Sequence, residues 1–222
     1  MYGLPSYVWA LVLIGVIGIP AITCLMLYRG AITAGLGRRT ATMVTVVAAT
    51  GLGGWLLASG LVARAGAYHQ ASGQAAPWFG VAVAGTLLVL LAATRIPVVA
   101  RILTAPGTPA RLALPHSLRV VGVTFLLVMA QGGGRTRAVW FNLFGLLDLV
   151  VALSIGFLAG LGPWRPLEVT PSTEPLSLLP LALVPTVAVP LAIALHIVSL
   201  SRLRAATRPD GDRTGDLLPA GG

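Results

Sequence analysis

The sequence predicts an all-α fold, a polytopic bundle of transmembrane helices, and two observations support this prediction. Hydrophobic residues make up 56% of the chain and charged residues only 9%, whereas about 25% of residues are charged in an ordinary soluble domain. Long runs also contain no Asp, Glu, Lys or Arg, namely Met1–Tyr28, Thr40–Ala63, Ala65–Thr94 and Pro175–Ser201. About 20 apolar residues cross a hydrocarbon core of ~30 Å as a helix, so each run is long enough to span.

Five segments are expected to be full spans, and they cover residues 7–28, 41–63, 78–94, 139–161 and 176–201. A short amphipathic stretch follows the third span and ends near Leu103. The second span contains Gly51–Gly54 and the fourth contains Gly156–Gly160, and such small residues let another helix approach closely. These glycine-rich faces are a route to a homo- or hetero-oligomer, or they serve contacts within the chain. Residues 1–201 are thus one transmembrane domain, and residues 202–222 form a polar tail expected to be disordered.

A sixth apolar segment, Leu118–Gln131, is too short to cross in the ordinary way, because it covers only about 21 Å as a helix. The arginines decide how it is read, since cytoplasmic loops carry an excess of positive charge. If the segment crossed fully, Arg135, Arg137 and the basic start of the tail would lie outside. A re-entrant or interfacial helix avoids this conflict. We therefore expect five full spans plus this short helix, with the N-terminus outside and the C-terminus cytoplasmic.

Three stretches, Pro115–Gly122, Trp140–Ala152 and Leu179–Leu191, carry a resemblance to a known family. Through them, residues 115–204 resemble a family of uncharacterised bacterial multi-pass membrane proteins. The resemblance implies a place in the bacterial cytoplasmic membrane. It also implies that this chain lacks a helix, because relatives carry another apolar stretch before the segment that begins at Arg135. The family implies no activity.

Asp148 is the ionisable residue expected to lie deepest in the bilayer, about 14 Å beyond the start of its span at Val139. Asn142 lies on the same span, nearer the cytoplasmic side and on a different face. Buried ionisable groups are costly in lipid, so they are candidates for function. Two readings stay open for Asp148: a proton- or cation-coupling site or polar substrate path, and a neutral acid that holds a neighbouring helix. Arg119 is an ion-pair partner for Asp148 only if the short segment reaches the same depth.

The last span contains three prolines, Pro180, Pro185 and Pro190. A proline leaves the carbonyl group four residues earlier without its helical hydrogen bond. Broken transporter helices use such carbonyls to bind ions or substrates, so Pro185 and Pro190 join Asp148 and Asn142 as a candidate path. An ordinary kink is the alternative. Arg95 and His196 are expected near the inner interface, where long or polar side chains reach water.

The sequence contains no catalytic motif that we recognise, so no enzyme activity, metal site or cofactor is expected. All fifteen basic residues are arginines in short connections or in the tail, which argues against a nucleic-acid partner and for the lipid bilayer. The first functional hypothesis is a transporter- or channel-like protein with a mid-membrane Asp148. The alternative is a non-catalytic membrane component that packs with partner subunits.

Overall fold

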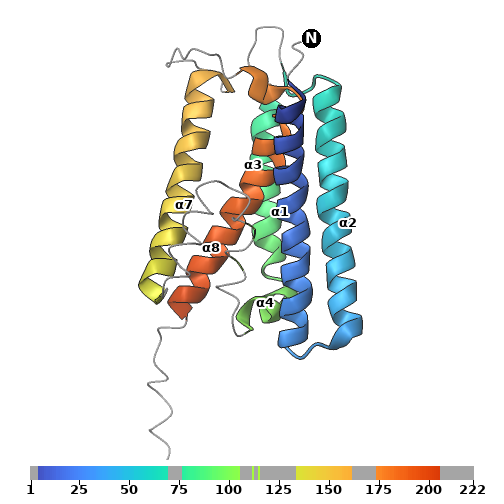
Figure 1. Ribbon diagram of the computed structural model, residues 1–222, viewed down its shortest axis with the longest axis vertical. Helices are drawn as coiled ribbons and strands as arrows, with labels where there is room; N and C mark the ends of the chain where they lie inside the picture. The colour runs from blue at the N-terminus through green and yellow to red at the C-terminus, as the bar shows by residue number, and fades with distance from the viewer. Residues whose placement is uncertain are drawn as a thin grey trace, which may run out of the picture.

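The computed structural model describes residues 5–69, 77–105, 112, 115, 134–161 and 174–205 (Figure 1). These residues contain helices and no β-strand, which confirms the predicted all-α class for the described part of the chain. In chain order the helices are α1 (Ser6–Thr33), α2 (Gly37–Arg64), α3 (Pro77–Ala93), α4 (Pro97–Thr104), α7 (Arg135–Gly156), η2 (Phe157–Leu161), η3 (Glu174–Ser177), η4 (Val184–Ala188) and α8 (Val189–Ala205). Helices η2 and η4 are π-helices, and η3 is a 3-10 helix.

Four of the described helical segments are long and apolar enough to cross a membrane, judged by length and composition. They are α1, α2, α7 extended into η2, and η4 joined to α8. Helices α3 and α4 form a fifth candidate if they count as one span that is bent by 78°. The bend falls where Ile96 is extended, because the residue before a proline avoids the helical conformation and Pro97 follows.

Helices α1 and α2 form an antiparallel hairpin (Figure 1). The turn between them uses Gly35 and Gly37, whose φ angles of 72° and 76° suit glycine and strain other residues. The Leu36 amide donates to the Ala31 carbonyl at 3.1 Å, which closes the end of α1. The two glycines and this hydrogen bond reverse the direction of the chain between α1 and α2.

The segment formed by η4 and α8 is the centre of the bundle. Its apolar stretch of 18 residues is 78% buried, against 11% to 22% for the corresponding stretches of the other three candidate spans. Val187, Leu191 and Leu195 of this segment pack against Val16 and Ile19 of α1 in the largest hydrophobic cluster. Helices α1, α3 and α7 also pack on α8 or η4, so the other helices surround it.

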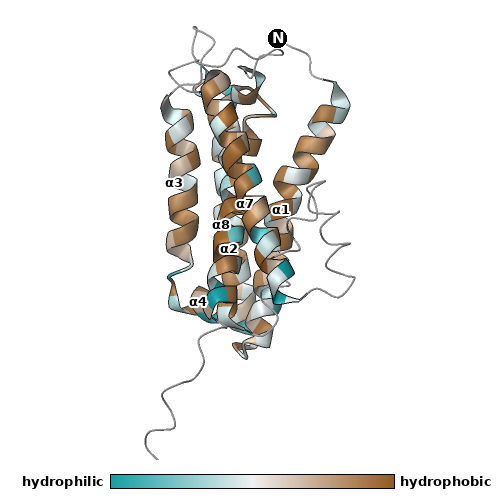
Figure 2. Ribbon diagram, turned by 90° about the vertical axis from the view of Figure 1, so that its left-hand side faces the viewer, coloured by the Kyte–Doolittle hydropathy of each residue, from teal (hydrophilic) through white to brown (hydrophobic). Residues whose placement is uncertain are grey.

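The two ends of the bundle differ in charge, because every described arginine except Arg64 belongs to the end that carries α4. The end of α1, the start of α2, helix α4, the start of α7 and the end of α8 all lie at one end (Figure 1). Figure 2 shows hydrophobic residues along the long helices and several hydrophilic residues near α4. At this end the Arg135 guanidinium donates to the Leu203 carbonyl at 2.6 Å and so ties α7 to the last turn of α8. At the opposite end, His69 Nδ1 lies 3.1 Å from Ser177 Oγ.

Helix boundaries differ modestly from the expected ones. The spans predicted at 7–28, 41–63 and 78–94 correspond to α1, α2 and α3. The span predicted at 139–161 begins earlier, at Arg135, and the last predicted span is divided into η3, η4 and α8. Helix α8 also continues beyond Ser201 to Ala205. The short segment 118–131 and residues 206–222 of the tail lie outside the described residues, so both remain predictions.

Candidate functional site

The last span is irregular where its prolines fall. Pro185 lies in the π-helix η4 and Pro190 lies near the start of α8. Each proline leaves one upstream carbonyl without an α-helical partner. The Leu181 carbonyl, four residues before Pro185, accepts a hydrogen bond from the Val184 amide at 3.0 Å. The first of the two freed carbonyls is therefore satisfied locally.

The second freed carbonyl belongs to Thr186, four residues before Pro190. It accepts a hydrogen bond from the indole N–H of Trp55 on α2 at 3.1 Å. A buried carbonyl without a donor is costly, and the indole offers only a donor, so the two groups are matched. Trp55 thus fastens α2 to the break in the last span.

Three hydroxyl groups form a chain beside this contact. The Thr186 hydroxyl donates to the Ala182 carbonyl at 2.7 Å and lies 2.8 Å from Ser59 Oγ. Since a hydroxyl has a single proton, Ser59 must donate to Thr186. Ser59 Oγ then accepts from the Tyr68 hydroxyl, 3.2 Å away. Tyr68, Ser59 and Thr186 are all buried, so the chain satisfies polar groups that no solvent reaches.

A cavity of about 1020 Å³ lies beside this polar cluster, and Trp55 and Tyr68 form part of its wall. Most of the lining residues belong to α2 and α3, and the others come mainly from α1, α4 and α8. Met43 and Val47 of α2, and Val89 of α3, line it and are 65% to 68% exposed. The cavity therefore opens sideways, between α2 and α3, onto the outer surface of the bundle. Its volume matches the upper end of small-molecule sites, about 300–1,000 Å³.

A second polar contact joins α7 to α8. His196 Nδ1 lies 3.1 Å from Asn142 Oδ1, and the Asn142 amide nitrogen donates to the Ala138 carbonyl at 2.7 Å. Because the amide oxygen is an acceptor, Nδ1 carries the proton in this contact. His196 is 1% exposed, and its ring is 5.5 Å from the ring of Phe141. The contact therefore lies inside the interface between α7 and α8.

Gly145 makes room for the His196 ring. A Cβ atom at Gly145 would lie 2.5 Å from His196 Nε2 and 3.3 Å from Nδ1, which is too close for any side chain. Glycine at this position therefore allows α7 to approach the histidine. The sequence placed His196 near the inner interface and did not pair it with Asn142.

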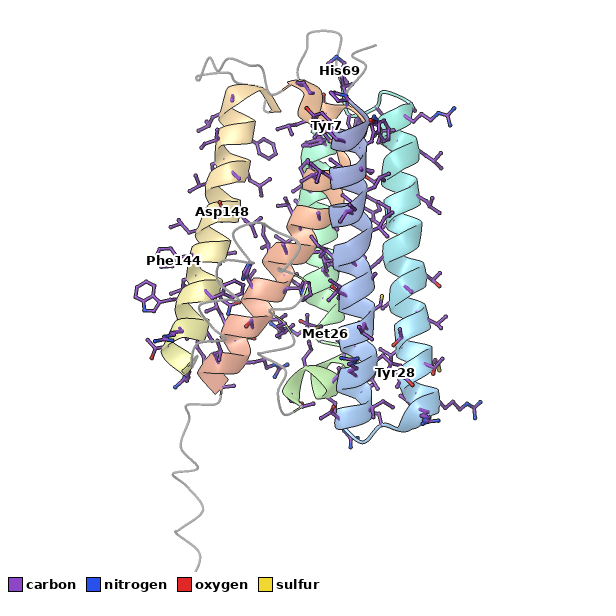
Figure 3. The ribbon with its side chains drawn as sticks, viewed as in Figure 1. Tyr7, Met26, Tyr28, His69, Phe144 and Asp148 are labelled. Atoms are coloured by element: carbon purple, nitrogen blue, oxygen red, sulfur yellow. The ribbon has the colours of Figure 1, made fainter. Side chains whose placement is uncertain are left out.

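Those predicted site residues that the structure describes lie in two separate places, on α7 and in the broken last span. Asn142 is buried against His196, whereas Asp148 is an exposed residue about half-way along α7 (Figure 3). No α7 residue is among those that line the cavity. Pro185 and Pro190 lie in the broken span, next to the Trp55 contact, and Arg119 lies outside the described residues. The described residues contain no group of three or more His, Cys, Asp or Glu side chains that could hold a metal ion.

Sequence reasoning did not find Trp55, Ser59, Tyr68 or Thr186. One signal was available: the position of Pro190 identifies the Thr186 carbonyl as the group that needs a donor. Nothing local identifies the donor, because Trp55 lies 131 residues away along the chain.

Comparison with known proteins agrees with part of the resemblance seen in the sequence. Residues 127–204 match a family described as a domain of unknown function (DUF8737). The match covers α7, η2 and the broken last span up to residue 204, but less than half of the 222 residues. No curated protein and no solved structure matches the chain. The similarity therefore supports the C-terminal helices as a unit and implies no activity.

Proposed function

We propose that this chain is an integral membrane protein that takes up an apolar or amphipathic molecule from the bilayer and carries it without chemical change, as a transporter does. The observation that carries the proposal is the lateral cavity. It opens between α2 and α3, where lipid would lie, and it reaches Trp55 beside the proline-broken span. Ligand sites at discontinuous helices are common in transporters.

The proposed setting is the cytoplasmic membrane of a bacterium, with the N-terminus outside and the C-terminus inside. The charge distribution supports this orientation, because every described arginine except Arg64 belongs to the end of the bundle that carries α4. Helix α4 ends on that side of the bundle, and helix α7 begins on the same side (Figure 1). This arrangement supports five full crossings and a segment 118–131 that returns to the side it came from.

The contact between Trp55 and Thr186 offers a way to couple ligand binding to the broken span. Trp55 faces the cavity and also holds the Thr186 carbonyl. A ligand that displaced the indole would expose this carbonyl and loosen α2 from η4. The proposal therefore places the moving part at Trp55 and the prolines, and Asp148 on a separate face of α7.

A test fills the cavity without disturbing its walls. A Cβ atom at Gly51 or Gly85 would meet nothing within 4 Å, and both glycines line the cavity. The protein is reconstituted into phosphatidylcholine vesicles, and the movement of a fluorescently labelled phospholipid between leaflets is followed by chemical quenching from outside. Gly51→Leu and Gly85→Leu should each slow the protein-dependent movement by about tenfold, since excluding a ligand group is worth about 1.4 kcal/mol or more.

The matched control is Gly53→Leu. Gly53 is on the same helix and has nothing within 4 Å of a built Cβ atom, but it does not line the cavity. This variant should move the labelled lipid at the wild-type rate. Wild-type vesicles that are no faster than protein-free vesicles would overturn the proposal, as would equal slowing by Gly53→Leu and Gly51→Leu.

A second candidate is a non-catalytic membrane component that packs with a partner subunit through α2. A Cβ atom added at Gly51, Gly53 or Gly54 would meet nothing within 4 Å, so none of these three glycines is closely covered by the rest of the chain. Small residues of this kind suit a close helix–helix contact. In this case Gly54→Leu should abolish a stable oligomer or the copurification of a second subunit, while labelled-lipid movement is absent even in the wild type.

A further inference from the structure

We propose that the molecule held in the lateral cavity is an anionic phospholipid, with its acyl chains between α2 and α3 and its headgroup phosphate against arginines at the α4 end. This inference rests on the proposed function, which makes the cavity a ligand site, and it adds the chemical class of the ligand. Three observations support the inference: the length of the cavity, the charge at one mouth, and the lack of Asp and Glu in residues 1–147.

The cavity has the length of a lipid chain. Its lining on α2 runs from Thr40 to Trp55 and beyond. The stretch between these two residues rises about 22 Å, which exceeds the ~15 Å thickness of one leaflet of the hydrocarbon core. On α3 the lining extends from Trp78 to the end of the helix. An acyl chain from one leaflet therefore fits lengthwise along an apolar surface.

Four exposed arginines belong to the segments that line the α4 end of the cavity. Arg38 and Arg39 directly precede Thr40, which is the first lining residue of α2. Arg95 lies between two lining residues at the bend after α3, and Arg101 lies on α4, three of whose residues line the cavity. Helix α2 also begins here without a side-chain cap, so its first amide groups add positive potential.

These arginines have no acidic neighbour in their own part of the chain. Residues 1–147 contain no Asp or Glu at all, and Asp148 is the first carboxylate in the sequence. Within the described residues, no ion pair involves Arg38, Arg39, Arg95 or Arg101. Counter-charge at this mouth must therefore come from outside residues 1–147. A phosphate attached to acyl chains supplies the charge and fills the cavity with one molecule.

The proposed orientation places this mouth at the cytoplasmic leaflet, where anionic lipids are enriched. A basic side chain near an anionic lipid surface strengthens binding by about fivefold. Two of the arginines together should thus favour an anionic over a zwitterionic lipid by about tenfold or more. The apolar cavity contributes equally to both lipids and sets total retention.

The experiment uses the full-length protein in detergent, mixed with equal amounts of dioleoyl-phosphatidylglycerol and dioleoyl-phosphatidylcholine. Native mass spectrometry counts each lipid that stays bound. The wild type should retain phosphatidylglycerol about tenfold more than phosphatidylcholine, and Arg39→Gln with Arg95→Gln should reduce this ratio to about twofold or less. The matched control, Arg64→Gln with Arg137→Gln, removes two exposed arginines that do not border the cavity and should keep the wild-type ratio.

Two further variants separate the cavity from the outer surface of the bundle. Gly51→Leu should lower the retention of both lipids, and Gly53→Leu should not. Equal retention of the two lipids by the wild type would overturn the anionic-lipid inference, yet the proposed function would stand if Gly51→Leu still slowed lipid movement. Retention unaffected by Gly51→Leu would overturn the cavity as the lipid site. A dimer that Gly51→Leu dissociates would assign the cavity to a second copy of the chain and overturn the inference.

Discussion

The indole N–H of Trp55 donates to the carbonyl oxygen of Thr186 at 3.1 Å. This carbonyl is the one that Pro190 deprives of its helical donor, so a residue of α2 completes the hydrogen bonding of the last span. The same tryptophan lines the lateral cavity. One side chain therefore connects the wall of the candidate ligand site to the break in the central segment.

Removing this donor should destabilise the protein. Trp55→Phe keeps most of the ring but leaves the Thr186 carbonyl without its partner, at an expected cost of about 1–3 kcal/mol. Unfolding by a denaturing detergent, followed by circular dichroism, measures the change. Trp9→Phe is the control, because Trp9 is 40% exposed on α1. In a Pro190→Ala background the new amide can serve the carbonyl, so Trp55→Phe should cost less there. Equal costs in the two backgrounds would refute the assignment.

Gly145 should tolerate no side chain while His196 is present. Gly145→Ala places a methyl group against the imidazole ring and should cost about 1–3 kcal/mol, because packed interiors resist added volume. His196→Ala removes the obstacle, so adding Gly145→Ala to it should cost nothing further. Gly85→Ala, with open space around its Cβ position, is the control and should not destabilise. The same unfolding assay measures these changes in stability. A Gly145→Ala variant as stable as the wild type would show that α7 and α8 pack less closely than the structure indicates.

The direction of the hydroxyl chain predicts unequal effects for its members. Thr186→Val removes the acceptor of the Ser59 proton and should cost about 1–3 kcal/mol. Tyr68→Phe removes only the first donor of the hydroxyl chain, so we expect a smaller loss of stability. Thr45→Val is matched to Thr186→Val, because Thr45 also donates to the carbonyl four residues earlier but bonds no second group among the described residues. Comparable losses of stability for Thr45→Val and Thr186→Val would contradict the proposed chain of hydroxyl groups.

Asp148 should be dispensable for lipid movement if the cavity is the ligand site. Asp148→Asn keeps the shape of an exposed α7 side chain that does not line the cavity. Vesicles with this variant should move labelled lipid within about twofold of the wild-type rate, because the ligand contacts lie elsewhere. A loss as large as that of Gly51→Leu would return Asp148 to the transport path that the sequence first suggested.

The orientation of the helices is testable by labelling from one side. In a Cys24→Ser background, single cysteines at Arg39, Arg64 and Arg137 are treated with an impermeant maleimide in intact cells. Only the cysteine at position 64 should react, because it lies at the end of α2 opposite to the arginine-rich end. Permeabilised cells should label all three. Labelling at position 137 in intact cells would contradict the proposed five-crossing arrangement.

The amino-acid sequence by itself determined that the chain forms long apolar helices, approximately where they lie along the chain, and which carbonyls the prolines release. These features depend on local composition and on backbone chemistry within a few residues. It also determined that residues 1–147 carry arginines and no carboxylate, which sets the charge at the cavity mouth.

Only the tertiary structure decided which helix is central. Helix α1 is the most hydrophobic of the four candidate spans, yet the segment that ends in α8 is the most buried. A helix that faces lipid is as apolar as one that faces the core, so hydropathy does not reveal which face is covered. The pairs Trp55–Thr186 and Asn142–His196 join residues 131 and 54 positions apart. Such partners are set by how the helices pack, and no local pattern in the chain encodes them.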